Sequence, residues 1–414
     1  MKTRIFRTNA LALLLAAALC LAGCAGKSGD PLPSPSVYAP TEAPTSVPTA
    51  APTEEPTPAP TDEPYEARVV REALERMSAK EKIGMLVMFG FTGRGQMDGE
   101  YAALGREYCV GNYIIGSVNV DKGAPDGGFE GVKELTSSIE RSDPLSTPRL
   151  FSTDVEGGTV VRFGFDPKLP SASELAEWPP DEVRELFEYI GQKLCECGVN
   201  LDLAPVCDVA EEPDKTLLGS RIFSSDPELA ARLCGAVSDG LHAGGCASCL
   251  KHFPGHGAVT GDSHTSVPET QKSAQELYEY DVEAFRLALS YSPDCVMAAH
   301  VLYPAFDEGN VASLSFSVLT GILRGDLGFE GVIISDDMLM AGLRESCPMD
   351  SAPLKFILAG GDVVLCGADP EVQRTVLETL TQAYEVRILT EERLNESAAR
   401  ILRLKLERGL WKPE

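Results

Sequence analysis

The sequence has little positive charge for its size. Lysine and arginine together number 36, against 62 aspartate and glutamate residues, and the formal net charge is −26 over 414 residues. A surface this acidic repels the phosphate backbone of nucleic acids and the headgroups of anionic lipids. The composition therefore argues against a nucleic-acid-binding protein and against membrane attachment through basic residues.

Apolar runs of membrane-spanning length are also absent. The longest candidate, Ala10–Leu21, follows three basic residues and has the length of a signal-peptide core rather than of a membrane span. It ends in Leu21-Ala22-Gly23-Cys24, which resembles a bacterial lipobox. We predict that residues 1–23 are a lipoprotein signal peptide. Cys24 would carry the lipid, so that the protein is extracytoplasmic and anchored to the bacterial cell membrane by that lipid alone. The alternative is an ordinary secretory signal with a chance cysteine.

Residues 24–64 have almost no apolar side chains to bury. Pro-Thr recurs every four residues from Pro40 to Thr61. Such a segment forms no core, and its proline density favours an extended polyproline II conformation of about 3.1 Å per residue. We predict a disordered Pro/Thr-rich linker that can hold the following domain on the order of 100 Å from its anchor.

The sequence contains 12 cysteines, which in an exported protein suggests disulfides. Ten remain once Cys20 and Cys24 are set aside with the signal region. Several of the ten lie inside apolar runs, namely Cys207, Cys246, Cys249, Cys295 and Cys366. We expect most of them to be buried thiols that pack as small apolar side chains.

Eight short apolar runs alternate with segments of helical periodicity from residue 65 onward. The runs are Met85–Phe91, Asn112–Val118, Leu150–Asp154, Val199–Val206, Cys246–Phe253, Cys295–Leu302, Gly331–Asp336 and Asp362–Cys366. Strands that alternate with helices form a parallel sheet, and eight such units fit a closed barrel. We predict an α/β fold in which residues 65–414 form one catalytic (β/α)8 TIM barrel. A doubly wound open sheet is the alternative.

Charged or imidazole side chains stand at or near the ends of the apolar runs. They are Asp154, Asp208, Lys251 with His252, His300 and Asp336. In a barrel of this kind the functional residues lie at the C-terminal ends of the strands. The pattern therefore predicts an active site at that end of the barrel.

The densest cluster runs from Lys251 to His264 and holds three of the five histidines of the chain. Asp262 and His264 are two residues apart, so an extended loop can turn both toward one site, where the carboxylate fixes the imidazole tautomer. We predict that His264 is a general acid/base oriented by Asp262. Zinc is the alternative reading of this cluster. It is disfavoured because Pro254 and the adjacent glycines break the helical histidine spacing that such a site favours.

Two further clusters carry carboxylates. Asp336 ends an apolar run, where it is placed to act as a nucleophile, a metal ligand or a base, and we expect its neighbour Asp337 to cap the following helix. Asp154 can accept hydrogen bonds from sugar hydroxyls, while Arg162 and Arg221 can donate to hydroxyls or hold carboxylates. A structural ion pair is the alternative for each arginine. No Gly-x-Ser-x-Gly motif occurs, which argues against a serine hydrolase.

Together these clusters resemble glycoside hydrolase family 3. The matching stretches are Lys251–Gly257 with Asp262-Ser263-His264, and Gly331–Asp337. They are most similar to the family's bacterial exo-β-N-acetylglucosaminidases that trim peptidoglycan fragments, because its glucosidases and xylosidases place an acid/base glutamate in a second domain. The similarity extends from about Lys80 to about Leu406.

The resemblance implies a role for each candidate residue. Asp336 is the expected nucleophile, and His264 is the expected acid/base with Asp262 as its orienter. N-acetylglucosamine is expected to be bound by Asp154, Arg162, Arg221, Lys251 and His252. The implied reaction is hydrolysis of terminal β-linked N-acetylglucosamine from cell-wall saccharides with retention of configuration. The expected enzyme is a monomer that needs no cofactor and no metal.

Three alternatives remain open from the sequence. The same chemistry on glucose or xylose is one. Phosphorolysis is another, because an imidazole acid/base does not repel an anionic acceptor as a carboxylate would. A carbohydrate-binding lipoprotein without catalysis is the third. Val155, Thr159, Ile222 and Ser224 depart from the usual family pattern, which bears on the sugar and aglycone preference.

Overall fold

The structure is a computed structural model, and it describes residues 63–257, 259 and 267–413. The predicted signal peptide, the lipidation site Cys24 and nearly all of the predicted linker lie outside the described residues. So do the predicted acid/base pair Asp262 and His264.

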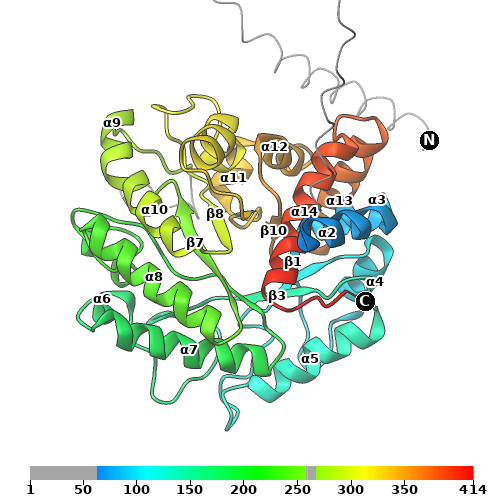
Figure 1. Cartoon of the computed structure of the whole chain (residues 1–414), viewed down its shortest axis with the longest axis horizontal. Coiled ribbons are helices and arrows are strands. Elements are labelled where there is room, and N and C mark those ends of the chain that lie inside the picture. Colours follow the sequence, from blue (N-terminus) through cyan, green and yellow to red (C-terminus); the bar gives the residue numbers. More distant parts are fainter. Residues whose placement is uncertain (1–62, 258, 260–266, 414) are drawn as a thin grey trace, which may run out of the picture. The chain divides into compact units, whose positions relative to one another are not determined.

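Eight parallel strands form the central barrel, and each lies in one of the eight apolar runs (Figure 1). They are β1 (Val87–Gly90), β2 (Asn112–Ile114), β3 (Leu150–Thr153), β6 (Leu201–Asp202), β7 (Ala247–Phe253), β8 (Cys295–Ala298), β9 (Val332–Ser335) and β10 (Val364–Cys366). The order is β10-β1-β2-β3-β6-β7-β8-β9, and a parallel bridge between Ile334 and Val363 brings the two ends of the sheet together. The prediction of a (β/α)8 barrel is confirmed, and the open doubly wound sheet is excluded.

The strands are apolar because both of their faces are covered. Almost every strand residue is buried, which is what continuous apolar runs predict for a parallel sheet enclosed by helices. A short antiparallel hairpin, β4 (Val155–Gly157) and β5 (Val160–Val161), leaves the barrel directly after β3.

Helices surround the barrel (Figure 1). They are α2 (Tyr65–Arg76), α3 (Ala79–Met85), α4 (Gly99–Tyr108), α5 (Phe129–Ser142), α6 (Ala172–Leu175), α7 (Pro180–Glu196), α8 (Pro227–Ala243), α9 (Ala274–Glu276), α10 (Val282–Ala288), α11 (Ala341–Ser346), α12 (Ala352–Ala359), α13 (Pro370–Glu385) and α14 (Glu391–Glu407). Residues 274–288 form one continuous helical segment that changes geometry, because α9 and α10 are joined by the π-helical turn Leu277–Asp281.

Local chemistry explains where α8 begins and how closely it packs. The side chain of Asp226 accepts a hydrogen bond from the Glu228 N–H, and Pro227 occupies the first helical position. Further along, α8 packs closely against α7 at Gly240. A β-carbon at Gly240 would lie 2.3 Å from the carbonyl oxygen of Arg184, so only glycine permits this approach of the two helices.

The last helix, α14, contacts the N-terminal ends of strands. Ser397 and Arg400 bind the carboxylate of Asp362, which precedes β10, at 2.7 and 3.0 Å. Arg408 binds Asp294, which precedes β8, at 2.6 Å. Lys405 in the same helix is fully buried, and its ammonium has no hydrogen-bond partner among the described residues.

The cysteines behave as predicted wherever the structure describes them. All ten described cysteines are free thiols, eight of them buried and two, Cys109 and Cys195, partly exposed. None of the described helices has the length and apolarity needed to cross a lipid bilayer.

Candidate active site

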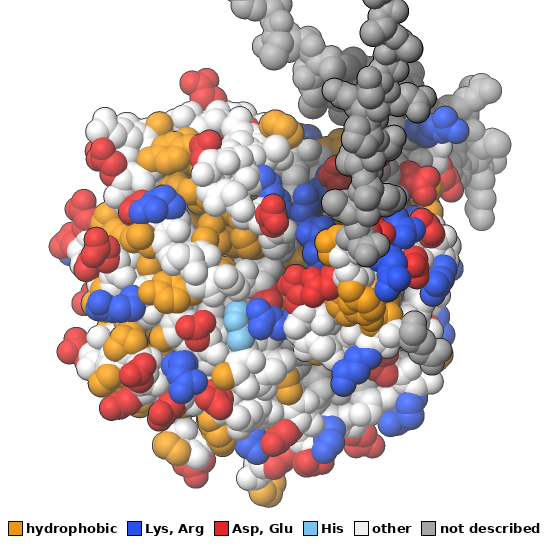
Figure 2. All heavy atoms as spheres, in the orientation of Figure 1, with side chains coloured by type: hydrophobic (Ala, Val, Ile, Leu, Met, Phe, Trp, Pro, Cys, Tyr) orange, Lys and Arg blue, Asp and Glu red, His pale blue; other side chains and the backbone are white. Residues whose placement is uncertain are grey.

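A pocket of about 780 Å³ opens at the C-terminal ends of the strands, which is the functional end of barrels of this kind. Figure 2 shows acidic, basic and histidine side chains gathered in the hollow of this face. Six predicted site residues line the pocket, namely Asp154, Arg162, Arg221, Lys251, His252 and Asp336. The structure therefore brings together every predicted site residue of the barrel that it describes.

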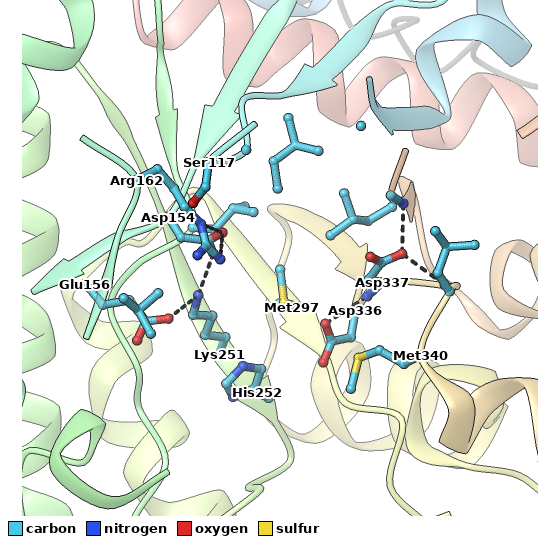
Figure 3. Close-up of a pocket in the computed structure, with 18 of the residues that line it drawn as sticks. Ser117, Asp154, Glu156, Arg162, Lys251, His252, Met297, Asp336, Asp337 and Met340 are labelled. Carbon is cyan, nitrogen blue, oxygen red and sulfur yellow. Dashed lines mark hydrogen bonds and ion pairs between the residues drawn. The ribbon is translucent and has the colours of Figure 1, made fainter. Parts of the chain in front are cut away.

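Lys251 is the centre of the charge network on one side of the pocket (Figure 3). It comes from β7, and its ammonium lies 3.0 Å from Asp154 Oδ1 and 2.6 Å from Glu156 Oε1. Burial alone would lower the pKa of this amine, but the two carboxylates outweigh that effect and raise it. Lys251 is therefore a fixed cation at neutral pH.

The hairpin that follows β3 returns Arg162 to Asp154. The Arg162 N–H donates to the Asp154 carbonyl across the hairpin at 3.1 Å, and its guanidinium contacts Asp154 Oδ2 at 3.0 and 3.2 Å. Burial would raise the pKa of Asp154, but Lys251 and Arg162 hold it at about 2. Asp154 is thus an anionic acceptor with its geometry set from two sides.

Glu156 completes this network and was not among the predicted site residues. Arg221 donates two hydrogen bonds to its carboxylate, at 2.7 and 2.8 Å, a bidentate geometry that fixes the guanidinium plane. Burial opposes ionisation of Glu156, yet Lys251 and Arg221 lower its pKa. The sequence signal that could have identified Glu156 was its position two residues after Asp154 in the same short run.

His252 is held by a second carboxylate that the sequence marked only as a strand-end residue. Asp208 Oδ2 lies 2.7 Å from His252 Nδ1 and accepts the His252 backbone N–H, while Oδ1 accepts the backbone N–H of His256 at 2.6 Å. An acceptor at Nδ1 places the proton there, so the unprotonated Nε2 is left for the pocket in the neutral ring. His256 also lines the pocket, and burial followed by the charge of His252 lowers its pKa.

Asp336 follows β9 directly and lies across the pocket from Lys251 (Figure 3). Its Oδ1 accepts the N–H of Asp337 at 2.8 Å. Burial would raise the pKa of Asp336, but the imidazoles of His252 and His300 and that N–H lower it below its ordinary value. The residue is therefore a carboxylate that faces the pocket, as a nucleophile must.

The expectation that Asp337 caps the next helix is wrong. Its Oδ1 accepts the N–H groups of Leu339 at 2.9 Å and Gly367 at 2.8 Å, whereas α11 begins only at Ala341. Asp337 instead joins the loop after β9 to the loop after β10. Burial raises its pKa despite these two donors.

The arrangement can hold a polyhydroxylated ligand between fixed cations and carboxylates on one side and an anionic nucleophile on the other. Within the described ranges, no group of three or more histidine, cysteine, aspartate or glutamate side chains is arranged to hold a metal ion.

Comparison with known proteins identifies relatives that share this arrangement of elements. The sequence model described as the N-terminal domain of glycosyl hydrolase family 3 matches residues 78–404. A β-hexosaminidase of Neisseria meningitidis is 40% identical over 252 residues, which cover 58% of this chain and 68% of that protein. The β-hexosaminidase LpqI of Mycobacterium tuberculosis is 33% identical over 337 residues, or 80% of this chain and 83% of that protein.

Solved structures agree in fold. A family 3 β-N-acetylglucosaminidase from Paenibacillus superposes with a TM-score of 0.75 and 31% identity, covering 81% of this chain and 63% of that one. The structure of M. tuberculosis LpqI gives a TM-score of 0.71 and 31% identity, covering 80% of this chain and 94% of that one.

Proposed function

The chain belongs to glycoside hydrolase family 3, and on that premise we propose that it removes terminal β-linked N-acetylglucosamine from cell-wall saccharides. The chain is a glycoside hydrolase of the β-N-acetylhexosaminidase type, acting on substrates that contain N-acetylglucosamine. The finer assignments, namely the cell-wall origin of the substrate and the role of each residue, are ours.

The observation that carries the proposal is the position of Asp336 opposite the ion-pair network. In the proposed reaction the Asp336 carboxylate attacks the anomeric carbon, and the bond to the leaving oxygen breaks. His264, oriented by Asp262, donates a proton to that oxygen. Water then releases the sugar from the glycosyl–enzyme ester, with His264 accepting a proton from it, and two displacements retain the configuration.

Sugar binding is assigned to the other side of the pocket. Asp154 and Glu156 remain ionised and accept hydrogen bonds from hydroxyl groups, while Arg162, Arg221 and Lys251 donate to hydroxyl or carbonyl oxygens. Because each of these groups is held by a charged neighbour, little side-chain entropy is lost when the sugar binds.

The test is an assay of the purified protein with the 4-nitrophenyl β-glycosides of N-acetylglucosamine, glucose and xylose, with and without EDTA. We expect turnover of the first substrate alone, insensitive to the chelator. Asp336→Asn should lower kcat/KM by at least about 1,000-fold, and His264→Ala should lower it strongly. The matched control is Asp239→Asn on the exposed face of α8, which should behave as wild type. Full activity of Asp336→Asn would refute the assignment.

We also propose that the protein is attached outside the cell membrane through a lipid on Cys24 and is a monomer. The sequence run that ends in Leu21-Ala22-Gly23-Cys24 supports the anchor. Metabolic labelling with a palmitate analogue should mark the wild-type chain and leave Cys24→Ala unlabelled. Light scattering of the detergent-free Cys24→Ala protein should give the mass of one chain, and a dimer mass would contradict the monomer.

A further inference from the structure

A fully buried carboxyl group is bonded to the hairpin that carries two of the sugar-binding carboxylates. Asp202 is the last residue of β6, and its side chain has no accessible surface. In the sheet it is paired with Thr153, the residue before Asp154, on one side and with Ser248 of β7 on the other. Asp202 does not line the pocket, so it has no direct access to a sugar.

One oxygen of Asp202 binds the hairpin between its two carboxylates. Oδ1 accepts the backbone N–H of Val155 at 2.9 Å, and Val155 stands between Asp154 and Glu156 in the sequence. Both carboxylates reach the Lys251 ammonium, Asp154 at 3.0 Å and Glu156 at 2.6 Å (Figure 3). The hydrogen bond of Asp202 therefore lies on the backbone from which both anionic partners of Lys251 extend.

The peptide group between Asp154 and Val155 is held at both of its polar atoms. Its carbonyl oxygen accepts the Arg162 N–H at 3.1 Å, which is a bond within the hairpin. Its N–H donates to Asp202, which belongs to the eight-stranded sheet. Asp202 thus connects the hairpin to the barrel at this peptide group.

The other oxygen of Asp202 indicates that the group is a neutral acid. Oδ2 is buried and has no hydrogen-bond partner among the described residues, and a buried ionised oxygen without a donor is costly. Burial raises the pKa of Asp202 well above its ordinary value, although the Val155 N–H and the charge of Lys251 act in the opposite direction. The useful feature of this side chain is therefore its accepting oxygen rather than a charge.

We propose that Asp202 is a positioning residue for sugar binding: its Oδ1 fixes the peptide group before Val155 and thereby holds Asp154 and Glu156 at the spacing that lets both contact Lys251. This inference rests on the proposed function, in which that side of the pocket binds the sugar. The nucleophile Asp336 follows β9, which is not adjacent to β6 in the sheet. Loss of the Asp202 contact should therefore weaken binding more than the chemical steps.

The first test compares two variants by KM, kcat and the calorimetric Kd for N-acetylglucosamine. Asp202→Asn keeps the accepting oxygen and should keep KM and Kd within about threefold of wild type. Asp202→Leu removes the acceptor and should raise KM and Kd by about 10-fold with kcat almost unchanged, because binding is lost equally in the ground state and the transition state.

Ser248→Ala is the matched control for this pair. Ser248 is as deeply buried as Asp202 and is its partner in the sheet. Its hydroxyl lies 3.3 Å from His242 of α8 and is not bonded to the hairpin. The variant therefore removes a buried polar group from the same layer of the barrel and should keep the wild-type KM and Kd.

The second test removes the donor instead of the acceptor, so that it decides the matter if Asp202→Leu fails to fold. Val155→Pro lacks the N–H, and Val155 is the first residue of β4, a position in which strands tolerate proline. Val155→Ala keeps the N–H and controls for the lost side chain. Relative to Val155→Ala, Val155→Pro should raise KM and Kd by about 10-fold. Combining it with Asp202→Leu should add little, because both changes remove the same hydrogen bond.

Either of two results would overturn the inference. One is a wild-type KM and Kd in Asp202→Leu, or in Val155→Pro relative to Val155→Ala. The other is an Asp202→Asn variant as impaired as Asp202→Leu. A purely structural role would lower the melting temperature and the fraction of folded enzyme but would leave KM and Kd unchanged. A wild-type protein that neither binds N-acetylglucosamine nor hydrolyses its β-glycoside would instead refute the proposed function.

Discussion

Replacing Lys405 with methionine should stabilise the protein strongly at acid and neutral pH. Lys405 bears the full desolvation cost of burial. Its side chain is 0% accessible, and its ammonium has no hydrogen-bond partner among the described residues. Methionine has a similar length and no charge, so it can fill the same space without a desolvation penalty.

The magnitude follows from the pKa. Burial lowers the pKa of Lys405 from 10.5 to about 7. The negative charge of Glu140 offsets only part of this effect, and the positive charge of Arg149 adds to it. One pKa unit corresponds to about 1.36 kcal/mol. Where Lys405 is protonated in both the folded and the unfolded state, it therefore lowers the free energy of unfolding by up to about 5 kcal/mol. Between about pH 7 and 10.5 the unfolded chain binds more protons at this site than the folded chain, so the cost falls as the pH rises. Near pH 9.5 about 1.4 kcal/mol remains.

The assay is chemical unfolding of wild type and Lys405→Met near pH 6 and near pH 9.5. We expect a gain of about 3–5 kcal/mol at the lower pH and about 1 kcal/mol at the higher one. The exposed Lys355→Met on α12 is the matched control and should change stability by less than about 0.5 kcal/mol at both. A gain that is absent, or equal at the two pH values, would refute an unpaired buried ammonium at this position.

Three further predictions concern the site and the thiols. Glu156→Gln leaves the cations Lys251 and Arg221 without their shared carboxylate, so we expect a higher KM and a loss of about 3 kcal/mol in unfolding free energy, measured by kinetics and denaturation. Asp208→Asn removes the charged acceptor of His252 and turns an amide NH2 toward a backbone N–H donor, so it should lower kcat/KM by about 10- to 100-fold and also lower the melting temperature. Thiol titration of the folded protein should show slow or no reaction of the eight buried cysteines, and a reductant should leave activity unchanged.

Two exposed carboxylates provide controls for the active-site variants. Glu130→Gln and Asp239→Asn alter exposed carboxylates and should be neutral. A Glu156→Gln enzyme with wild-type KM would show that the ion pairs do not orient sugar-binding groups. Rapid reaction of most thiols in the folded protein, or activation by a reductant, would contradict the buried free thiols.

The barrel could be predicted from sequence because its signal is local. A strand buried on both faces must be apolar along its whole length, so each of the eight runs, such as Gly331–Asp336 for β9, carries its own signature. The same rule located the site, since a charged residue that ends such a run lies at the functional end of the barrel. Asp154, Lys251 and Asp336 were found in this way.

The pairings between side chains could not be predicted, because they depend on where loops return. Arg221 meets Glu156 across 65 positions, and Asp208 meets His252 across 44. The sequence shows that these charges exist but not which of them touch. Asp337 illustrates the same limit. A helix cap was inferred from neighbouring residues alone, whereas its actual partner Gly367 lies in the loop after β10.

The ion pairs around Lys251 also determine which sugars the pocket should reject. Among the described residues on that side, each of the three cations contacts one of only two carboxylates, Asp154 and Glu156, within 3.2 Å, so each cation already has an anionic partner. The chain as a whole carries a charge of −26. A sugar acid would meet long-range repulsion on approach and would have to compete with Asp154 and Glu156 for the cations that the structure describes on that side. Selection against charged sugars thus precedes any recognition of shape.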